Sequence, residues 1–178
     1  LTKDAIMVKA DLVVIIGGDG TIIKSAASAG AKTPLILAVN MGNRGFFTEI
    51  KADQLEAALQ KVFQKQFTID KRELLEVAHY RHNKKIAQYL VLNEVLIGQN
   101  LPLRLIEFSL SLDEDTQLTC KADGIIIATP SGSTAHSLSA GGSIVHPSLK
   151  AILITPLTPL TPHSRPLVIP GEQTFTIT

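Results

Sequence analysis

A glycine-rich turn with a single carboxylate is the first segment of this chain that could do chemistry. Asp19 stands among glycines in Gly17-Gly18-Asp19-Gly20-Thr21. Glycine lets a ligand approach the backbone amides without meeting a Cβ, and the free N–H groups at a helix start attract an anion. Phosphate is therefore the expected ligand. A carboxylate beside phosphate needs a divalent cation to hold or a proton to accept, so Asp19 is a candidate Mg²⁺ ligand or general base; the alternative is a residue that satisfies donors at the helix start.

A second glycine-rich segment places another carboxylate and several small residues around an apolar run. Asp123 lies in Ala122-Asp123-Gly124, where it is either a functional carboxylate or a turn-forming Asp-Gly. After Ser131-Gly132-Ser133 come small and hydroxyl side chains that can lie flat against a base or nicotinamide. These candidate ligand contacts are Thr134, Ala135, His136 and Ser139. The histidine offers a flat ring with a hydrogen-bonding edge, and its alternative is a surface histidine.

Two polar residues interrupt a run that is otherwise apolar. Asn93 and Glu94 separate 89–92 from 95–97, and burying them without partners would cost stability. An amide beside a carboxylate can hold a cis-diol, because the carboxylate accepts hydrogen bonds from both hydroxyls. The pair is therefore a candidate ribose site, or else a strand-edge pair that faces solvent.

The periodicity of the chain predicts which elements position these residues. Residues 12–16 are continuously apolar, as in a parallel strand covered on both faces, and a helix and a second strand at 35–39 come after them. Another helix is predicted from the capping pair Asp53 and Glu56 and from an apolar face of Leu55, Ala58, Leu59, Val62 and Phe63. From residue 67 the period changes to two, as in the alternating run 106–112, with turns predicted at 82–85 and 113–115.

These patterns predict an α/β N-terminal domain over 1–66 with a Rossmann-like parallel sheet, followed by a mainly β domain over 67–178. Only ten residues precede Asp11, and the chain stops inside the strand-like run 174–177. We therefore expect a chain that is truncated at both ends.

Composition excludes several classes of function. The 178 residues carry a net charge of +1 with scattered basic residues, so neither nucleic acid nor a membrane surface is an expected partner. The single cysteine, Cys120, cannot form an internal disulfide, and no signal or membrane-spanning segment is present, which predicts a cytoplasmic protein. His79 and His82 are three residues apart in a β-like run, so they point to opposite faces and predict no shared metal.

The order of these motifs resembles that of the NAD kinase family over nearly the whole chain. The matching segments are GGDGT, Asn40 to Glu49, Leu92-Asn93-Glu94, ADGIIIATPSGSTAHSLSAGG, Pro162-His163-Ser164 and Arg165-Pro166-Leu167. GGDGT by itself is also similar to the phosphate-binding turn of diacylglycerol-type lipid kinases and to a motif of 6-phosphofructokinases. The long block from Ala122 to Gly142 is the specific part.

The resemblance implies a phosphotransferase with an alcohol group as acceptor. ATP or inorganic polyphosphate would phosphorylate the 2′-hydroxyl of the adenosine ribose of NAD to give NADP, with Mg²⁺ or another divalent cation. It assigns catalysis to Asp19 and dinucleotide contacts to Asp19, Gly20, Asn93, Glu94, Thr134, Ala135, His136 and Ser139. Most family members have tyrosine where His136 stands. The dinucleotide is expected between the two domains.

The resemblance also implies assembly and leaves three weaker candidates. The aspartate matching Asp123 reaches a dinucleotide bound mainly by the neighbouring subunit, which predicts a homodimer or homotetramer with a shared active site. Phe46 is either a lid near the base or part of the core, Arg44 either meets a phosphate or caps its loop, and Arg165 is a further candidate contact. Two other functions stay open: a diacylglycerol-type lipid kinase, and a non-catalytic NAD(P)-binding sensor.

Overall fold

The computed structural model describes residues 2–28, 34–41, 45–48, 50–99, 105–112, 117–161 and 163–178. Contacts divide the chain into two compact units. The N-terminal unit comprises Leu1–Lys71 and Glu76–Leu90, and the C-terminal unit comprises Arg72–Leu75 and Val91–Thr178. The domain boundary predicted after residue 66 stays a prediction.

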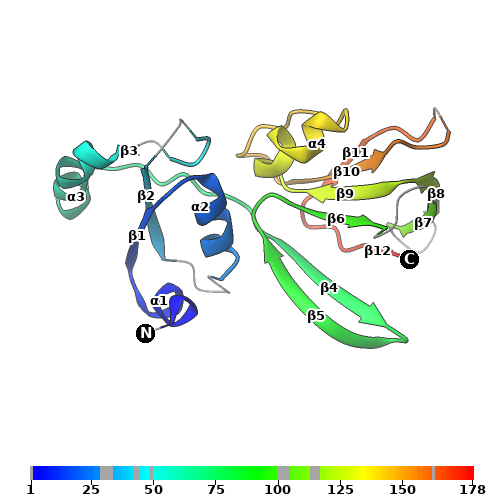
Figure 1. Ribbon diagram of the computed structural model, residues 1–178, viewed down its shortest axis with the longest axis horizontal. Helices are drawn as coiled ribbons and strands as arrows, with labels where there is room; N and C mark the ends of the chain where they lie inside the picture. The colour runs from blue at the N-terminus through cyan, green and yellow to red at the C-terminus, as the bar shows by residue number, and fades with distance from the viewer. Residues whose placement is uncertain are drawn as a thin grey trace. The chain divides into compact units, whose positions relative to one another are not determined.

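The N-terminal unit is built on a three-stranded parallel sheet in the order β1-β2-β3 (Figure 1). Its strands are β1 (Leu12–Ile16), β2 (Leu35–Asn40) and β3 (Ile50–Lys51), with the helix α1 (Lys3–Lys9) before β1 and α2 (Asp19–Ala26) directly after it. The predicted strands at 12–16 and 35–39 are thus confirmed, together with the strand-to-helix turn. Ile22 and Ala26 of α2 are buried, as the helical spacing predicts.

The expected burial of β1 on both faces is wrong. Ile15 is buried, whereas Val14 and Ile16 on the opposite face are 37% and 55% exposed. In the described sheet β1 pairs only with β2, so it is an edge strand, and the continuous apolar run overstated how much of it is covered.

The helix α3 (Leu55–Phe63) forms, but it begins differently from the prediction. A 3₁₀ turn, η1 (Ala52–Gln54), precedes it, and the Lys51 N–H donates to Gln54 Oε1 at 3.1 Å. Asp53 and Glu56 therefore do not act as the capping pair. The apolar face is present in sequence, yet no residue of α3 is buried and Phe63 is 79% exposed.

A two-stranded hairpin belongs mostly to the N-terminal unit. It consists of β4 (Leu75–Arg81) and β5 (Lys84–Val91). His82 and Asn83 have φ of 49° and 60°, the left-handed pair that a two-residue hairpin turn needs, and this confirms the predicted turn. No residue of either strand is buried.

The C-terminal unit is mainly β, as predicted. One antiparallel sheet has the order β11-β10-β9-β6, formed by β6 (Glu94–Gly98), β9 (Gly124–Ala128), β10 (Ala151–Leu157) and β11 (Leu167–Pro170). A second has the order β12-β7-β8, formed by β7 (Ile106–Ser111), β8 (Gln117–Ala122) and β12 (Thr176–Ile177). The alternation of β7 is confirmed by buried Phe108 and Leu110, and the turn predicted at 113–115 lies outside the described residues.

The core of this unit lies on both faces of β9. Ile125 and Ile127 pack with Phe108, Ile152 and further apolar residues on one face, and Ile126 and Ala128 pack with Leu153 and Val145 on the other. All five residues of β9 are buried. The strand is therefore a rigid support for the two short helical segments after it, η2 (Ser131–Thr134) and α4 (His136–Ser139).

Within the part of the chain that the structure describes, no helix is both long and apolar enough to cross a membrane. Cys120 is a free, half-buried thiol.

Candidate functional site

Asp19 occupies the first turn of α2 and holds a neighbouring loop. Gly18 is the N-cap, and the Asp19 carboxylate does not bond to its own helix but accepts hydrogen bonds from two backbone N–H groups. Phe46 N–H donates to Oδ2 at 2.8 Å and Phe47 N–H donates to Oδ1 at 3.1 Å. The carboxylate therefore has a fixed orientation, and each oxygen keeps lone-pair capacity for a ligand.

The close approach between this loop and Asp19 depends on a glycine. A Cβ at Gly45 would lie 2.2 Å from Asp19 Oδ1 and 2.8 Å from Thr48 Oγ1. Thr48 is only 4% exposed, and its hydroxyl has no hydrogen-bond partner among the described residues. A buried hydroxyl without a partner costs about 1–3 kcal/mol, so this loop carries a cost that its packing does not explain.

The glycines beside Asp19 leave room for a ligand. A Cβ at Gly18 or at Gly20 would meet nothing within 4 Å, and both residues are exposed. Phe46 is 77% exposed, which does not fit the core alternative for this side chain. Arg44 lies outside the described residues.

In the C-terminal unit, two neighbouring side chains have buried polar atoms that no described residue satisfies. Asn93 Oδ1 and Glu94 Oε2 are buried and lack hydrogen-bond partners within the described ranges. They stand where β5 passes into β6. Two adjacent buried acceptors leave a place for a ligand that donates from two neighbouring hydroxyls, as a ribose does.

The backbone around this pair is clamped by Thr129 and Gly132. Thr129 Oγ1 donates to the Leu92 carbonyl at 2.5 Å, Thr129 N–H donates to the Asn93 carbonyl at 2.8 Å, and Gly132 N–H donates to Thr129 Oγ1 at 3.2 Å. A Cβ at Gly132 would lie 2.3 Å from the Asn93 carbonyl oxygen. Only glycine allows η2 to approach the pair this closely.

Burial and His136 shift the pKa of the Glu94 carboxyl in opposite directions. Burial raises the pKa of the Glu94 carboxyl above its ordinary value of 4.5, and the charge and backbone N–H of His136 oppose part of that rise. The side chain as a whole is half-buried even though Oε2 is buried. A ligand that donates hydrogen bonds to this carboxylate would stabilise its ionised form.

The residues of the GSTA segment divide into a buried and an accessible set. Ser133 and Ser137 are fully buried, and their hydroxyls serve the fold: Ser133 Oγ donates to the Pro130 carbonyl at 2.7 Å, and Ser137 Oγ lies 2.9 Å from Thr155 Oγ1. The four predicted ligand contacts are partly or fully exposed, namely Thr134, Ala135, His136 and Ser139. The predicted contacts are therefore the ones that a ligand could reach.

Asp123 stands at the start of β9 and is exposed. Its N–H donates to the Leu157 carbonyl at 3.0 Å, and its carboxylate accepts a hydrogen bond from the Thr158 hydroxyl. Thr158 has φ of 42°, a conformation that a β-branched residue rarely adopts. In its own chain, Asp123 thus holds a strained turn.

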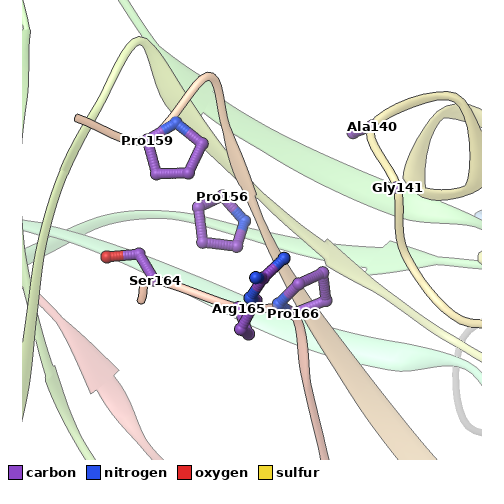
Figure 2. Close-up of a pocket in the computed structure, with 7 residues that line it drawn as sticks. All are labelled: Ala140, Gly141, Pro156, Pro159, Ser164, Arg165 and Pro166. Atoms are coloured by element: carbon purple, nitrogen blue, oxygen red, sulfur yellow. The ribbon is translucent and has the colours of Figure 1, made fainter. Parts of the chain in front are cut away.

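A shallow cavity of about 280 Å³ opens near Arg165 (Figure 2). Three prolines and Ser164 surround it together with the loop after α4; the lining residues are Ala140, Gly141, Pro156, Pro159, Ser164, Arg165 and Pro166. None of the residues predicted to hold the dinucleotide, apart from the weaker candidate Arg165, lines this cavity.

Neither Thr48 nor Gly132 was found from the sequence, and Thr129 and Thr158 were missed as well. Their roles come from contacts with residues that the chain pattern does not connect to them. Only Gly132 carried a local signal, because a glycine between serines suggests a close backbone approach.

Comparisons with known proteins place both halves of the chain in one family. The family model described as the ATP-NAD kinase N-terminal domain matches residues 1–67, and the model described as the ATP-NAD kinase C-terminal domain matches residues 92–178. The NAD kinase of Pseudomonas entomophila is 41% identical over 167 residues, which cover 94% of this chain and 56% of that protein. The NAD kinase of Geotalea daltonii is 41% identical over 175 residues, which cover 98% of this chain and 62% of that protein.

Solved structures agree with this assignment. The crystal structure of yeast NADH kinase complexed with NADH has a TM-score of 0.91 at 32% identity, covering 99% of this chain and 52% of that one. The NAD kinase from Archaeoglobus fulgidus in complex with ATP has a TM-score of 0.79 at 26% identity, covering 98% of this chain and 66% of that one. The chain spans about half to two thirds of these proteins. Since residues 1–67 match the N-terminal domain model and residues 92–178 match the C-terminal domain model of the ATP-NAD kinases, the chain belongs to the NAD kinase family.

Proposed function

We propose that this protein phosphorylates NAD at the 2′-hydroxyl of the adenosine ribose to give NADP, with ATP as donor. The observation that carries the proposal is a pair of buried acceptors, Asn93 Oδ1 and Glu94 Oε2, that have no hydrogen-bond partner among the residues that the structure describes. Such a pair suits a ribose with two adjacent hydroxyls, and the membership of the chain in the NAD kinase family supports the same ligand.

The residues take separate roles in this proposal. Asn93 and Glu94 bind a ribose of the dinucleotide, and Thr134, Ala135, His136 and Ser139 form a surface for a base or the nicotinamide. Gly20 leaves the dinucleotide room beside α2. The acceptor oxygen attacks the γ-phosphorus, the bond from that phosphorus to the β–γ bridging oxygen breaks, and ADP leaves. Asp19 accepts the proton of the attacking hydroxyl.

The donor set around Asp19 fits a divalent cation. Within the described ranges no three His, Cys, Asp or Glu residues gather, but Mg²⁺ in phosphoryl-transfer sites is held through one or two carboxylates and the substrate phosphates. Asp19 has a fixed orientation and spare lone pairs, so it is the residue that would hold the ion. When bound, Mg²⁺ supplies positive charge against the phosphate oxygens.

A coupled assay of NADP formation tests the function and the donor. The purified protein is incubated with NAD, Mg²⁺ and either ATP or inorganic polyphosphate, and NADP is measured with an NADP-specific dehydrogenase. We expect NADP with ATP, and activity with polyphosphate would widen the donor class. NAD binding without NADP formation would instead favour the non-catalytic sensor. Diacylglycerol serves as the negative acceptor control, because both halves of the chain match NAD kinase models.

Assembly and location extend the proposal. We propose a homodimer or homotetramer in which Asp123 contacts a dinucleotide bound mainly by the neighbouring subunit, and a cytoplasmic protein. The exposure of Asp123 supports the first point, because a carboxylate at the surface is available to another subunit.

A further inference from the structure

The buried hydroxyl of Thr48, in the N-terminal unit, has no part in the mechanism proposed above. The side chain is 4% exposed, and its Oγ1 has no hydrogen-bond partner among the described residues. Two hydrogen bonds from neighbouring backbone N–H groups to Asp19 hold the loop that carries it. The hydroxyl is therefore fixed in place without a partner in the described part of the chain.

Thr48 and Asp19 lie on either side of the same glycine. Their oxygens, Oγ1 and Oδ1, are 2.8 Å and 2.2 Å from the point where Gly45 would carry a Cβ. The two oxygens are thus at most about 5 Å apart without bonding to each other, a separation that one bridging oxygen atom spans with two ordinary hydrogen bonds.

Chemistry restricts what that bridging atom can be. The ionised Asp19 carboxylate only accepts hydrogen bonds, so the bridging group must donate one to it. An unprotonated phosphate oxygen cannot do this, whereas an alcohol can, as can the water that an alcohol would displace. The Thr48 hydroxyl can in turn donate to the alcohol oxygen, which keeps a second lone pair for attack on phosphorus.

We propose that Thr48 hydrogen-bonds the acceptor hydroxyl and holds it against Asp19. The inference rests on the proposed function, in which that hydroxyl is the 2′-hydroxyl of the adenosine ribose. Thr48 then fixes the direction of the attacking lone pair, and the substrate supplies the hydrogen-bond partner that the described residues do not give its hydroxyl.

The first experiment replaces the hydroxyl without changing the side-chain shape. Thr48→Val should lower kcat/KM for NAD by about 5- to 30-fold and leave KM for ATP unchanged. Tm should be unchanged or higher, because the buried hydroxyl has no partner among the described residues to lose. Thr48→Ser keeps the hydroxyl and should stay within about threefold of wild type. Thr155→Val is the matched control for stability, because its hydroxyl lies 2.9 Å from Ser137 Oγ, and its Tm should fall.

The second experiment asks whether Thr48 and the 2′-hydroxyl contact each other. Calorimetry measures the binding of NAD and of the analogue that lacks the adenosine 2′-hydroxyl, each to wild type and to Thr48→Val. We expect wild type to prefer NAD by about 3- to 10-fold and the variant to show a smaller preference, because Thr48→Val removes one of the hydrogen bonds that the 2′-hydroxyl makes and leaves its bond to Asp19.

Three results would overturn the inference. They are an equal preference for NAD in wild type and variant, a normal kcat/KM in Thr48→Val, and a fall in Tm as large as that of Thr155→Val, which would make the hydroxyl structural. Failure of the proposed function would give a different result, because wild type would then form no NADP. The binding comparison between NAD and the analogue would still test whether Thr48 contacts the 2′-hydroxyl.

Discussion

The carboxylate of Asp19 has two roles that a substitution cannot fully separate. It carries the charge for catalysis, and it accepts the N–H groups of Phe46 and Phe47. An asparagine in its place would keep one acceptor oxygen but would direct an NH₂ group at one of those N–H donors. The loop next to the site is therefore expected to loosen when the charge is removed.

We expect Asp19→Asn to lower kcat by about 10² to 10⁴, because the proton acceptor and potential cation ligand is lost. Tm should also fall, since one of the two loop hydrogen bonds is replaced by a donor facing a donor. Steady-state kinetics and thermal unfolding measure both effects. Near-normal turnover with a lowered Tm would leave Asp19 a purely structural residue.

Glu94 is expected to lower the stability of the folded protein at neutral pH and to strengthen the binding of NAD. Burial raises its pKa above 4.5, so the folded protein binds this proton more tightly than the unfolded chain does. The associated stability is fully present below pH 4.5 and is lost as pH rises through the raised folded value. Glu94→Gln, which cannot ionise, should therefore unfold at a higher Tm than wild type at pH 7.

The same substitution should weaken NAD binding, because only the ionised carboxylate accepts from two hydroxyls. Affinity of the wild type for NAD should fall as pH is lowered through the pKa of Glu94, and the variant should lack that dependence. Calorimetric titration at several pH values tests this. An unchanged affinity for NAD in Glu94→Gln would contradict ribose binding by this residue.

Among the elements, η2 can lie close to the turn before β6 because Gly132 has no side chain. Gly132→Ala would place a Cβ 2.3 Å from the Asn93 carbonyl oxygen, so the backbone of the ribose pair must move. We expect the substitution to lower the free energy of unfolding by about 1–3 kcal/mol. It should also reduce the affinity for NAD more than the affinity for ATP.

Gly98→Ala is the matched control on β6, because its Cβ would meet its nearest neighbour, the Asp123 carbonyl oxygen, at an ordinary 3.6 Å. It should leave Tm unchanged or slightly raised. Equal losses of Tm in both variants would show that the contact with Asn93 is not the cause.

Most elements could be predicted from local pattern, and the errors have physical reasons. The turn at His82 and Asn83 and the alternation of β7 depend on neighbouring residues, which the sequence contains. The two-sided burial expected of β1 failed because an apolar run does not reveal whether a strand lies at an edge. The start of α3 was misplaced because Gln54, which lies between the two expected residues, supplied the acceptor.

The candidate site was predictable in residue identity but not in contacts. Asn93 and Glu94 stood out as polar residues inside an apolar run. The bonds from Phe46 and Phe47 to Asp19 join positions 27 and 28 residues apart, and nothing local indicates them. Thr48 was unremarkable in sequence for the same reason, since its missing partner is a fact of packing.

For the whole molecule, the C-terminal unit has apolar side chains that its own chain leaves exposed. They include Leu96, Leu138, Ile144, Leu149 and Val168, each between 41% and 68% exposed. Self-association is one way to bury such a surface, and it agrees with the proposed use of Asp123 by a neighbouring subunit.

Mixed subunits test the shared site. Neither Asp19→Asn nor Asp123→Ala should be active alone, but after subunit exchange at equal amounts some sites contain both aspartates. In a dimer, about a quarter of the sites should be intact, with that fraction of wild-type activity. Thr158→Gly is the control, because it removes the partner of Asp123 within the chain and tolerates the φ of 42°. Activity in a monomer, or no rescue despite exchange, would contradict the shared site.

The low stability expected of the hairpin β4–β5 limits how rigidly Asn93 and Glu94 are held. Two-stranded ribbons are marginally stable in water, and no residue of this one is buried. Its amide hydrogens should therefore exchange with solvent through local opening, well before those of the fully buried β9. Because β5 ends at Val91, each opening reaches to within two residues of Asn93. The bond from Thr129 N–H to the Asn93 carbonyl thus marks the place where a rapidly fluctuating segment meets a slowly exchanging one.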